Sequence, residues 1–313
     1  MTTLDVPPAV LYTLGGILAL LVAATLIVTV LRRLRPAADL SELAARIKSW
    51  WVMVVIFTLA IAVSRTVSIV FFAIVSFLAL KEYFSLIPTR RADRRVLFWA
   101  YLTIPFQYYW VAEAWYGMFI IFVPVYAFLF IPLRMVITGE TQHFLRAAGT
   151  IHWGLMLMVF SLSHLAFLLA LPEDGNPGAG GAGLVLFLVF LTQFNDVAQY
   201  TWGKLLGRHK LVPKVSPKKT VEGLAGGVAS TTVLGGLLAP SLTPLSNVEG
   251  LVVGLVIAVA GFAGDVNISA LKRDLAVKDS GQLIPGHGGI LDRIDSLTFA
   301  APLFFHYLRY FHY

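Results

Sequence analysis

The 313-residue chain has no cysteine, which excludes disulfide bonds, thiolate metal sites and cysteine nucleophiles. Charged residues are also scarce, at 13% of the chain, against about 25% in an ordinary soluble protein. Hydrophobic residues make up 58% and the mean hydropathy is +0.79. So few polar side chains cannot cover a water-facing surface of this size. Soluble globular, disordered and coiled-coil classes are therefore excluded, and a membrane protein is predicted.

Several common signatures are missing too. No repeat of 20–50 residues, no Walker phosphate-binding loop and no HExxH or other metal-spaced histidine set occurs. What the chain does carry is a net charge of +7. In a soluble protein this excess would suggest nucleic acid as a partner. In a membrane protein, basic cytoplasmic loops and anionic membrane lipids explain it better, so nucleic acid is not expected.

Apolar runs that approach the length needed to cross a bilayer recur along the chain. The first is not a cleaved signal peptide, because basic residues follow it rather than precede it. The second and third are short and meet at Arg65, so they form either a tight hairpin or a partly re-entrant pair. The last is marginal in length. The ten candidate segments are 9–31, 49–64, 66–80, 96–112, 114–133, 150–171, 183–200, 224–239, 248–263 and 297–308.

Basic residues alternate between the connecting segments. Segments 32–48, 81–95, 134–148, 203–222 and 267–296 hold 5, 5, 2, 6 and 4 Lys or Arg, which is 22 of the 24 in the chain. The opposite connection 172–182 has two acids and no base. The positive-inside rule then places the N-terminus outside and these five segments in the cytoplasm. The predicted fold class is an all-α polytopic membrane protein of about nine or ten transmembrane helices, with a polar active-site cavity on the cytoplasmic side.

The composition also divides the chain into two parts. Residues 1–190 read as hydrophobic scaffold helices, whereas 191–313 carry most of the clustered Asp, Lys, His and Gly. Asp196 lies near the inner end of a predicted span, where an ionisable residue is costly and is a functional candidate, although a wet interface is the alternative.

The segment 203–223 combines glycines with several bases. Glycine permits close backbone approach to a phosphate and the bases can neutralise it, although a loop that touches anionic headgroups is the equal alternative. Ser216 or Thr220 is expected to cap a helix that begins near Val221. The predicted substrate-binding residues are Asp196, Ser216, Lys218, Lys219, Thr220, Glu222 and Ser269.

Residues 265–295 contain five acids, four bases, four glycines and a proline, so the segment cannot lie in hydrocarbon and must border a polar cavity. Mg²⁺ prefers one or two carboxylates together with substrate phosphates, and Asp265 and Asp292 are the predicted pair. A loop of self-paired ions is the alternative, favoured for Asp274 and Asp279 when each is considered alone. His287 is a general base, a phosphate donor or a turn residue.

The run from Ser269 to Asp295, SALKRDLAVKDSGQLIPGHGGILDRID, resembles the signature of the phosphatidate cytidylyltransferases (CDP-diacylglycerol synthases). That signature has Ser, Lys-Arg, Lys-Asp, His-Gly-Gly, Asp-Arg and a final Asp. The runs GKLLGRHKL and SPKKTVEG within 196–223 also resemble this family, less specifically, because CTP-dependent polyprenol kinases carry a similar stretch. The resemblance is strong over about 195–300 and only architectural before it.

The resemblance implies transfer of CMP from CTP to phosphatidate, with release of CDP-diacylglycerol and pyrophosphate. It implies Mg²⁺ at Asp265 and Asp292, with a potassium ion beside it, and a site that faces the cytoplasm from the bacterial inner membrane. A homodimer is compatible with the sequence, which does not fix the oligomeric state. The predicted catalytic residues are Asp265, Asp292, Lys272, Arg273, Lys278, Asp279, His287 and Arg293.

Two departures from the family pattern suggest a divergent branch. Ile268 stands where many members have Glu, and Ala198-Gln199-Tyr200 stands where many have Ala-Tyr. They leave three other readings open: a cytidylyltransferase for another phospholipid, a CTP-dependent lipid or polyprenol kinase that transfers the γ-phosphoryl group, or a non-catalytic transporter or scaffold that kept the motif.

Overall fold

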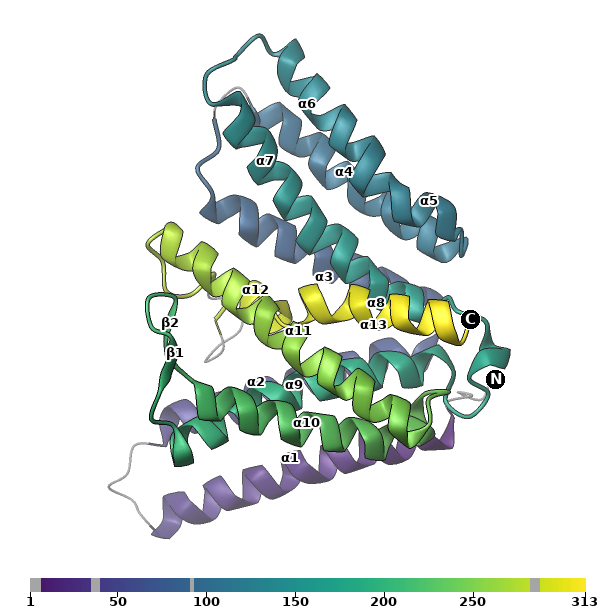
Figure 1. The fold of residues 1–313 in the computed structure, drawn as a ribbon, viewed down its shortest axis with the longest axis vertical. Coiled ribbons are helices and arrows are strands. Elements are labelled where there is room, and N and C mark those ends of the chain that lie inside the picture. Colours follow the sequence, from purple (N-terminus) through teal and green to yellow (C-terminus); the bar gives the residue numbers. More distant parts are fainter. Residues whose placement is uncertain (1–6, 35–39, 91–92, 282–287) are drawn as a thin grey trace.

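The computed structural model describes residues 7–34, 40–90, 93–281 and 288–313, and this part of the chain is almost entirely helical (Figure 1). The helices of its first half are α1 (Pro8–Leu34), α2 (Ser41–Val63), α3 (Arg65–Leu86), α4 (Arg94–Ala112), α5 (Tyr116–Ile121), the π-helix η2 (Phe122–Ala127), α6 (Phe128–Ile137), α7 (Phe144–Leu155), the π-helix η3 (Met156–Ser161), α8 (Leu162–Leu168) and the short 3₁₀ helix η4 (Glu173–Gly175). The second half has α9 (Gly180–Leu206), β1 (Lys210–Val212), β2 (Ser216–Thr220), α10 (Val221–Leu242), α11 (Asn247–Asp274), α12 (Leu291–Ile294) and α13 (Leu297–Phe311).

Each of the ten predicted apolar segments lies in a helical region, and eight helical stretches of the described residues are long and apolar enough to cross a membrane. Two of the eight are composite, because α5, η2 and α6 form one stretch and α7, η3 and α8 another. The remaining two segments differ. The α4 helix falls short of the apolar character of the others, and α13 has only 15 residues. The chain is thus an all-α polytopic integral membrane protein.

The second and third segments are full-length helices. The α2 and α3 helices have 23 and 22 residues, and only Ser64 separates them. Ser64 has extended backbone, and its hydroxyl accepts a hydrogen bond from the Val67 amide, which caps α3. A partly re-entrant pair is therefore not what the chain forms, and the tight connection is the correct alternative.

The described parts of the five basic segments gather at one end of the bundle. The β1–β2 hairpin, the end of α1, the α3–α4 and α6–α7 connections and the end of α11 all lie on the left of Figure 1, whereas the start of α1 and the end of α13 lie on the right. This arrangement is what alternation of the basic segments requires, since successive spans cross in opposite directions.

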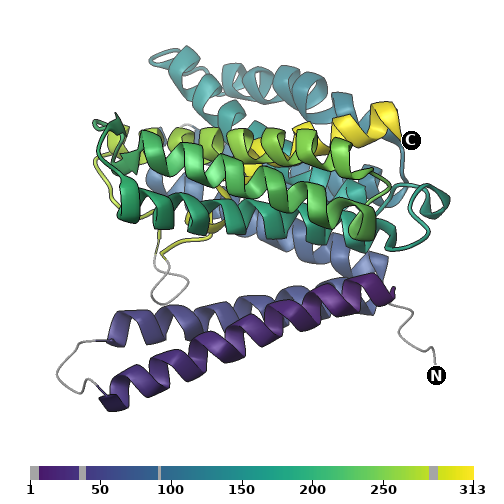
Figure 2. The same ribbon diagram turned by 60° about the horizontal axis from the view of Figure 1, so that its bottom comes forward.

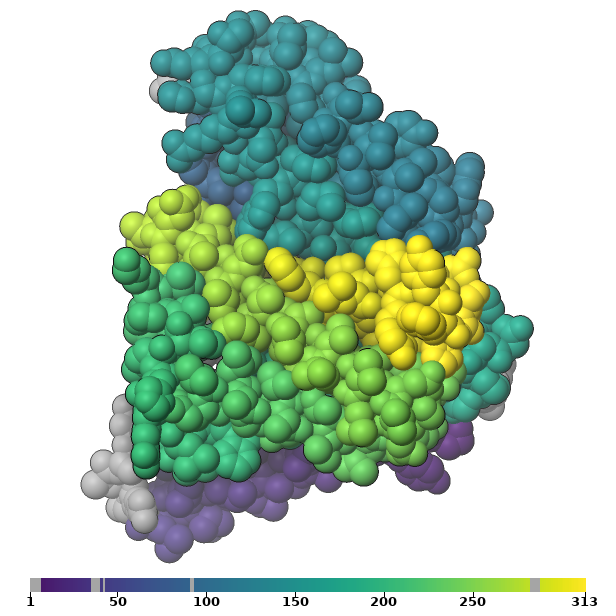
Figure 3. Space-filling view, viewed as in Figure 1, coloured from purple at the N-terminus to yellow at the C-terminus, as the bar shows by residue number. Residues whose placement is uncertain are grey.

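The helices form a central layer with a separate pair beside it. Figure 2 shows α1 and α2 as an antiparallel pair apart from the main bundle. Few side chains of α1 are buried, namely Val10, Leu14 and Val28. Figure 3 shows α10, α11 and α13 side by side, with the region of α4–α7 beyond them.

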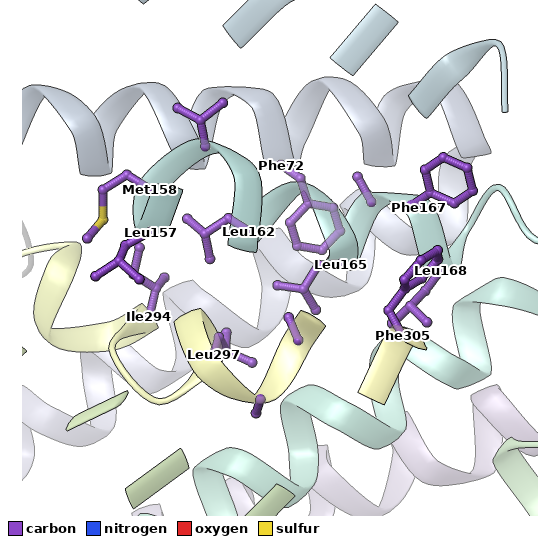
Figure 4. Packing of buried hydrophobic residues seen from close by; sticks show 14 of the residues in the cluster. Phe72, Leu157, Met158, Leu162, Leu165, Phe167, Leu168, Ile294, Leu297 and Phe305 are labelled. Atoms are coloured by element: carbon purple, nitrogen blue, oxygen red, sulfur yellow. The ribbon is translucent and has the colours of Figure 1, made fainter. Parts of the chain in front are cut away.

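The apolar core lies where α3, η3 and α8 meet α12 and α13. Leu157, Leu162 and Leu165 face Ile294 and Leu297 across this contact (Figure 4). All five side chains are less than 10% exposed. Because Ile294 and Leu297 flank the last acidic residue of the signature, this packing fixes the signature against the scaffold helices.

Glycines let α9, α10 and α11 approach closely. A Cβ atom added at Gly223 of α10 would lie 2.8 Å from the carbonyl oxygen of Gln199 in α9. One added at Gly235 would lie 2.7 Å from the carbonyl oxygen of Gly250 in α11. Small residues at such contacts are typical of helix pairs in membranes, where close backbone packing replaces the hydrophobic effect.

We expect Gly235→Val to destabilise the bundle by about 1–3 kcal/mol or more, because the added side chain meets backbone that cannot rotate away. The matched control is Gly16→Val on α1, where an added Cβ has no neighbour within 4 Å. Thermal unfolding of both variants in the same detergent measures the difference. Equal melting temperatures for the two variants would contradict close packing of α10 on α11.

Candidate active site

The second half of α11 presents three of the predicted site residues along one face. Asp265, Ser269 and Lys272 are spaced four and three residues apart, which places them on the same side of a helix. Ser269 donates a hydrogen bond to Asp265 Oδ1 at 3.2 Å. Asp265 and Lys272 are two turns apart, or about 10 Å along the axis. Along this face the acidic Asp265 therefore lies farther from the end of α11 than the basic Lys272 does.

The segment predicted as a basic loop contains a two-stranded antiparallel hairpin, β1–β2, in which Lys210 pairs with Thr220 and Val212 with Ser216. Successive side chains of a strand point to opposite faces. Lys219 accordingly turns inward, whereas Lys218 is exposed. Lys219 Nζ lies 2.5 Å from Asp265 Oδ2 and 4.8 Å from the centre of the Phe262 ring.

The hairpin ends at the start of α10. Thr220, rather than Ser216, is the N-cap, and its hydroxyl accepts a hydrogen bond from the Gly223 amide at 3.1 Å. The carboxylate of Glu222 accepts from the amides of Arg208 and His209 at 3.0 and 3.2 Å, and it contacts the His209 ring. Thr220 and Glu222 thus hold the hairpin to α10 and keep Lys219 against α11.

Two further carboxylates, those of Asp196 and Asp295, lie near Asp265. Asp196 of α9 accepts a hydrogen bond from the Ser296 hydroxyl at 3.2 Å, and the Ser296 amide donates to Asp295 Oδ1 at 2.7 Å. Burial, and then the negative charges of Asp265 and Asp196, raise the pKa of Asp295 well above its ordinary value. The three carboxylates therefore lie within electrostatic reach of one another, from α9, α11 and the junction of α12 with α13.

Asp292 lies at a separate contact nearer the end of α11. Its Oδ1 accepts from Lys272 Nζ at 2.5 Å. Its Oδ2 accepts from the Ser280 amide at 3.1 Å, the Ser280 hydroxyl at 2.9 Å and the Gly289 amide at 3.2 Å. Burial raises the pKa of Asp292, but these hydrogen bonds and the Lys272 charge outweigh it, so that the pKa is lowered overall.

The glycines of the signature fit this geometry. Gly288 has φ of +79°, which favours glycine, and a Cβ there would lie 2.7 Å from Asp292 Oδ2.

The remaining predicted catalytic residues differ in their surroundings. His287 lies outside the described residues. Arg273 donates to the Val215 carbonyl at 3.0 Å and so links α11 to the hairpin. Lys278 and Asp279 are exposed, and the Nε atom of Arg293 is buried without a hydrogen-bond partner.

The donor atoms around Asp265 suit a hard cation. They are carboxylate and hydroxyl oxygens, which are the ligands that Mg²⁺ prefers. Burial beside Asp196 and Asp265 disfavours the charged form of Asp295, and Lys219 and Arg293 are the nearby bases. Among the described residues no group of three or more acidic or histidine side chains is placed to hold a metal ion. A Mg²⁺ ion held here would need water and substrate phosphates beside one or two carboxylates.

Sequence reasoning missed three residues that the structure brings to the site, Asp295, Ser296 and Glu82. Asp295 was part of the quoted signature but received no role. Glu82 comes from α3, which continues six residues beyond the predicted span 66–80. Its carboxylate accepts from the Ile290 and Leu291 amides at 2.9 and 3.2 Å. An Asp or Glu just past the end of an apolar run was the available signal for Glu82.

Comparison with known proteins shows the family of the chain. Residues 44–311 match the sequence model described as the cytidylyltransferase family. The chain is 46% identical over 297 residues to the uncharacterized protein YnbB of Escherichia coli (strain K12), covering 95% of this chain and 97% of YnbB.

Shorter matches link the chain to named enzymes. It is 49% identical over 114 residues to the phosphatidate cytidylyltransferase of Synechocystis sp. and 40% identical over 140 residues to that of Bacillus subtilis. These matches cover 36% and 44% of this chain, and 39% and 52% of the two relatives. The chain therefore spans about half or less of the length of these named relatives.

The fold and the site define a polytopic membrane protein with an acidic and basic cluster at one end of its bundle. The chain belongs to the cytidylyltransferase family, a family of nucleotidyltransferases, and it resembles the phosphatidate cytidylyltransferases within it.

The Lys272–Asp292 pair predicts strong energetic coupling. Their side chains are only 13% and 8% exposed, and removing one partner of a buried pair costs about 3–5 kcal/mol because the other charge is left uncompensated. We expect Lys272→Met to destabilise the protein substantially and Asp292→Asn to relieve much of that loss in the double variant. Unfolding in detergent gives the four free energies, with exposed Lys214→Met as control. Additive losses would contradict the coupling.

Proposed function

We propose that the protein is a phosphatidate cytidylyltransferase, which transfers CMP from CTP to phosphatidate and releases CDP-diacylglycerol and pyrophosphate. The observation that carries this proposal is the convergence of the two motif segments, 196–223 and 265–296, in two partly buried groups of carboxylates and bases along the end of α11, one around Asp265 and one around Asp292. The partial matches to named phosphatidate cytidylyltransferases support it.

The location of the cluster suits a reaction between a soluble nucleotide and a lipid. The cluster lies at the end of the bundle that carries the basic segments (Figure 1). The positive-inside rule favours the cytoplasmic face for that end, where CTP is found. Exposed Lys218 and Lys278 then face the aqueous side and attract the triphosphate, while the lipid enters from the leaflet.

The proposed chemistry is a single in-line displacement. A phosphate oxygen of phosphatidate attacks the α-phosphorus of CTP, and the bond from that phosphorus to the bridging oxygen of pyrophosphate breaks. The attacking phosphate is already ionised at neutral pH, so a general base is not required. As in other phosphoryl transfers, positioning and charge stabilisation then account for most of the catalysis.

Asp265 and Asp292 are the proposed metal ligands, and each carboxylate is now paired with a lysine, Lys219 and Lys272 respectively. Bound Mg²⁺, with potassium beside it, would neutralise charge on the nucleotide phosphates. Lys219 and Lys272, now paired with Asp265 and Asp292, would be released toward the phosphates when a cation takes over those carboxylates. The unpartnered Nε atom of Arg293 is a further donor for a phosphate oxygen.

Removal of either proposed metal ligand is expected to stop the reaction. Asp265→Asn and Asp292→Asn should each lower the rate of CDP-lipid formation at least about a hundredfold, roughly 2.7 kcal/mol in the barrier, while the protein still inserts into the membrane. Arg146→Gln, an exposed base in the 134–148 segment, is the control that should remain active. Near-normal turnover in both Asn variants would remove the metal assignment.

Labelled CTP distinguishes the proposed transfer from that of a lipid kinase. Purified protein with Mg²⁺ and phosphatidate should move label from the α-phosphate of CTP into lipid and release pyrophosphate, and a chelator should stop both. Label entering lipid from the γ-phosphate would indicate a kinase. Transfer to another phosphorylated lipid in a parallel panel, but not to phosphatidate, would overturn the acceptor. The absence of both products would reject an enzyme of either kind.

A further inference from the structure

Glu82 connects the scaffold helices to the signature. It lies near the end of α3, and both of its carboxylate oxygens accept hydrogen bonds from the backbone that begins α12: Oε2 from the Ile290 amide at 2.9 Å and Oε1 from the Leu291 amide at 3.2 Å. These partners are 208 and 209 residues away along the chain. Apolar packing also joins α3 to the region of α12, and the Glu82 carboxylate adds a polar link between them.

The backbone closes tightly around this carboxylate. A Cβ atom added at Gly289 would overlap Glu82 Oε1, and one added at Gly281 would lie 2.9 Å from Oε2. Both glycines belong to the signature run 269–295. Their lack of side chains therefore leaves space that the Glu82 carboxylate fills.

The same short segment also holds Asp292. Asp292 Oδ2 accepts from the Gly289 amide, and Glu82 accepts from the next two amides, those of Ile290 and Leu291. Two carboxylates thus bind three successive N–H groups, which would otherwise be unpaired at the start of a helix. The α12 helix that these groups begin carries Asp292 and Arg293.

We propose that Glu82 is a positioning residue, which sets the placement of Asp292 and Arg293 by fixing the start of α12. The inference deepens the proposed function and depends on it for its catalytic consequence. Glu82 is not assigned a contact with substrate or metal. Loss of its carboxylate would leave two amides unpaired and release the start of α12, so that Asp292 and Arg293 no longer hold one geometry.

The substitutions that test this are Glu82→Leu, which removes both acceptors, and Glu82→Gln, which keeps one acceptor oxygen at the same position. Exposed Glu113, at the end of α4 on the opposite side of the bundle, supplies the matched controls Glu113→Leu and Glu113→Gln. Hydrogen–deuterium exchange over peptides that span 288–295 measures the contact itself and needs no activity. Cytidylyl transfer at several Mg²⁺ concentrations, per folded protein, measures its consequence.

We expect Glu82→Leu to speed exchange at residues 290 and 291, to lower kcat by about 10- to 100-fold and to raise the Mg²⁺ concentration needed for half-maximal rate. Glu82→Gln should recover part of each effect, and both Glu113 variants should match the wild type. A purely structural role would reduce the amount of folded protein but leave kcat and the Mg²⁺ requirement of the folded fraction unchanged.

Unchanged exchange in Glu82→Leu would overturn the inference, and so would faster exchange with unchanged kcat and Mg²⁺ requirement. If Glu82→Leu does not fold, Glu82→Gln decides between these outcomes. A wild-type protein that transfers no cytidylyl group would reject the proposed function instead. In that case, protection at 290 and 291 that is lost in the Glu82 variants would still support fixation of α12 by Glu82.

Discussion

The structure depends on how a mostly apolar bundle accommodates charge at one of its ends. Carboxylates that leave water need a partner, because an isolated buried charge costs several kcal/mol. Here Asp265 and Asp292 are each paired with a lysine at 2.5 Å. Asp295 has no cation as close, and its raised pKa reflects burial beside two other carboxylates. A cation bound at this end of the bundle would favour the charged form of these carboxylates, and the proposed chemistry depends on that exchange.

The packing of the helices explains why these charges meet. Glycines on α10 allow close contact with both α9 and α11, so Asp196 and Asp265 come from helices held against a common neighbour. A Cβ at Gly261 of α11 would lie 3.5 Å from Ser296 Cβ and 3.6 Å from Asn195 Nδ2. Asn195 is held in turn by the Thr231 hydroxyl and the Ala258 carbonyl. The acidic cluster therefore occupies a junction whose backbone is closely defined.

Ile268 has a simple structural setting. It is fully buried in the apolar core and lies between Asp265 and Ser269 on the sequence of α11. A glutamate there would need a partner of its own, and the chain instead buries an aliphatic side chain. The carboxylates that lie near Asp265 come instead from other elements, Asp196 from α9 and Asp295 from the junction of α12 with α13.

Much of the architecture was predictable from the sequence, because it follows from composition and alternation. Long apolar runs and basic segments on alternate connections determine helices and their direction, and the ten segments were all found as helices. The capping of α10 was predictable, since Thr220 precedes a small-residue helix. Contacts made through the backbone were not predictable. The inward turn of Lys219 depends on a hairpin whose two strands have three and five residues, and the Glu82 contact depends on amides more than 200 positions away.

The site residues were likewise predictable in part. Motif residues identified both segments that converge, but spacing alone could not tell that Asp292 pairs with Lys272 while Asp265 faces Asp196 and Asp295. It also could not show that Arg273 is engaged by the Val215 carbonyl. Three-dimensional packing decides these pairings, because it gives chemically identical residues such as Asp265 and Asp292 different partners.

The central claim is that the acidic cluster binds a divalent cation together with the nucleotide. Electron paramagnetic resonance of Mn²⁺, added to purified protein with and without CTP, tests it directly. The account predicts bound Mn²⁺ that increases when CTP is present and a strong loss of that signal in Asp265→Asn. Failure of the wild-type protein to bind Mn²⁺ with CTP, or equal binding by the variant, would contradict it.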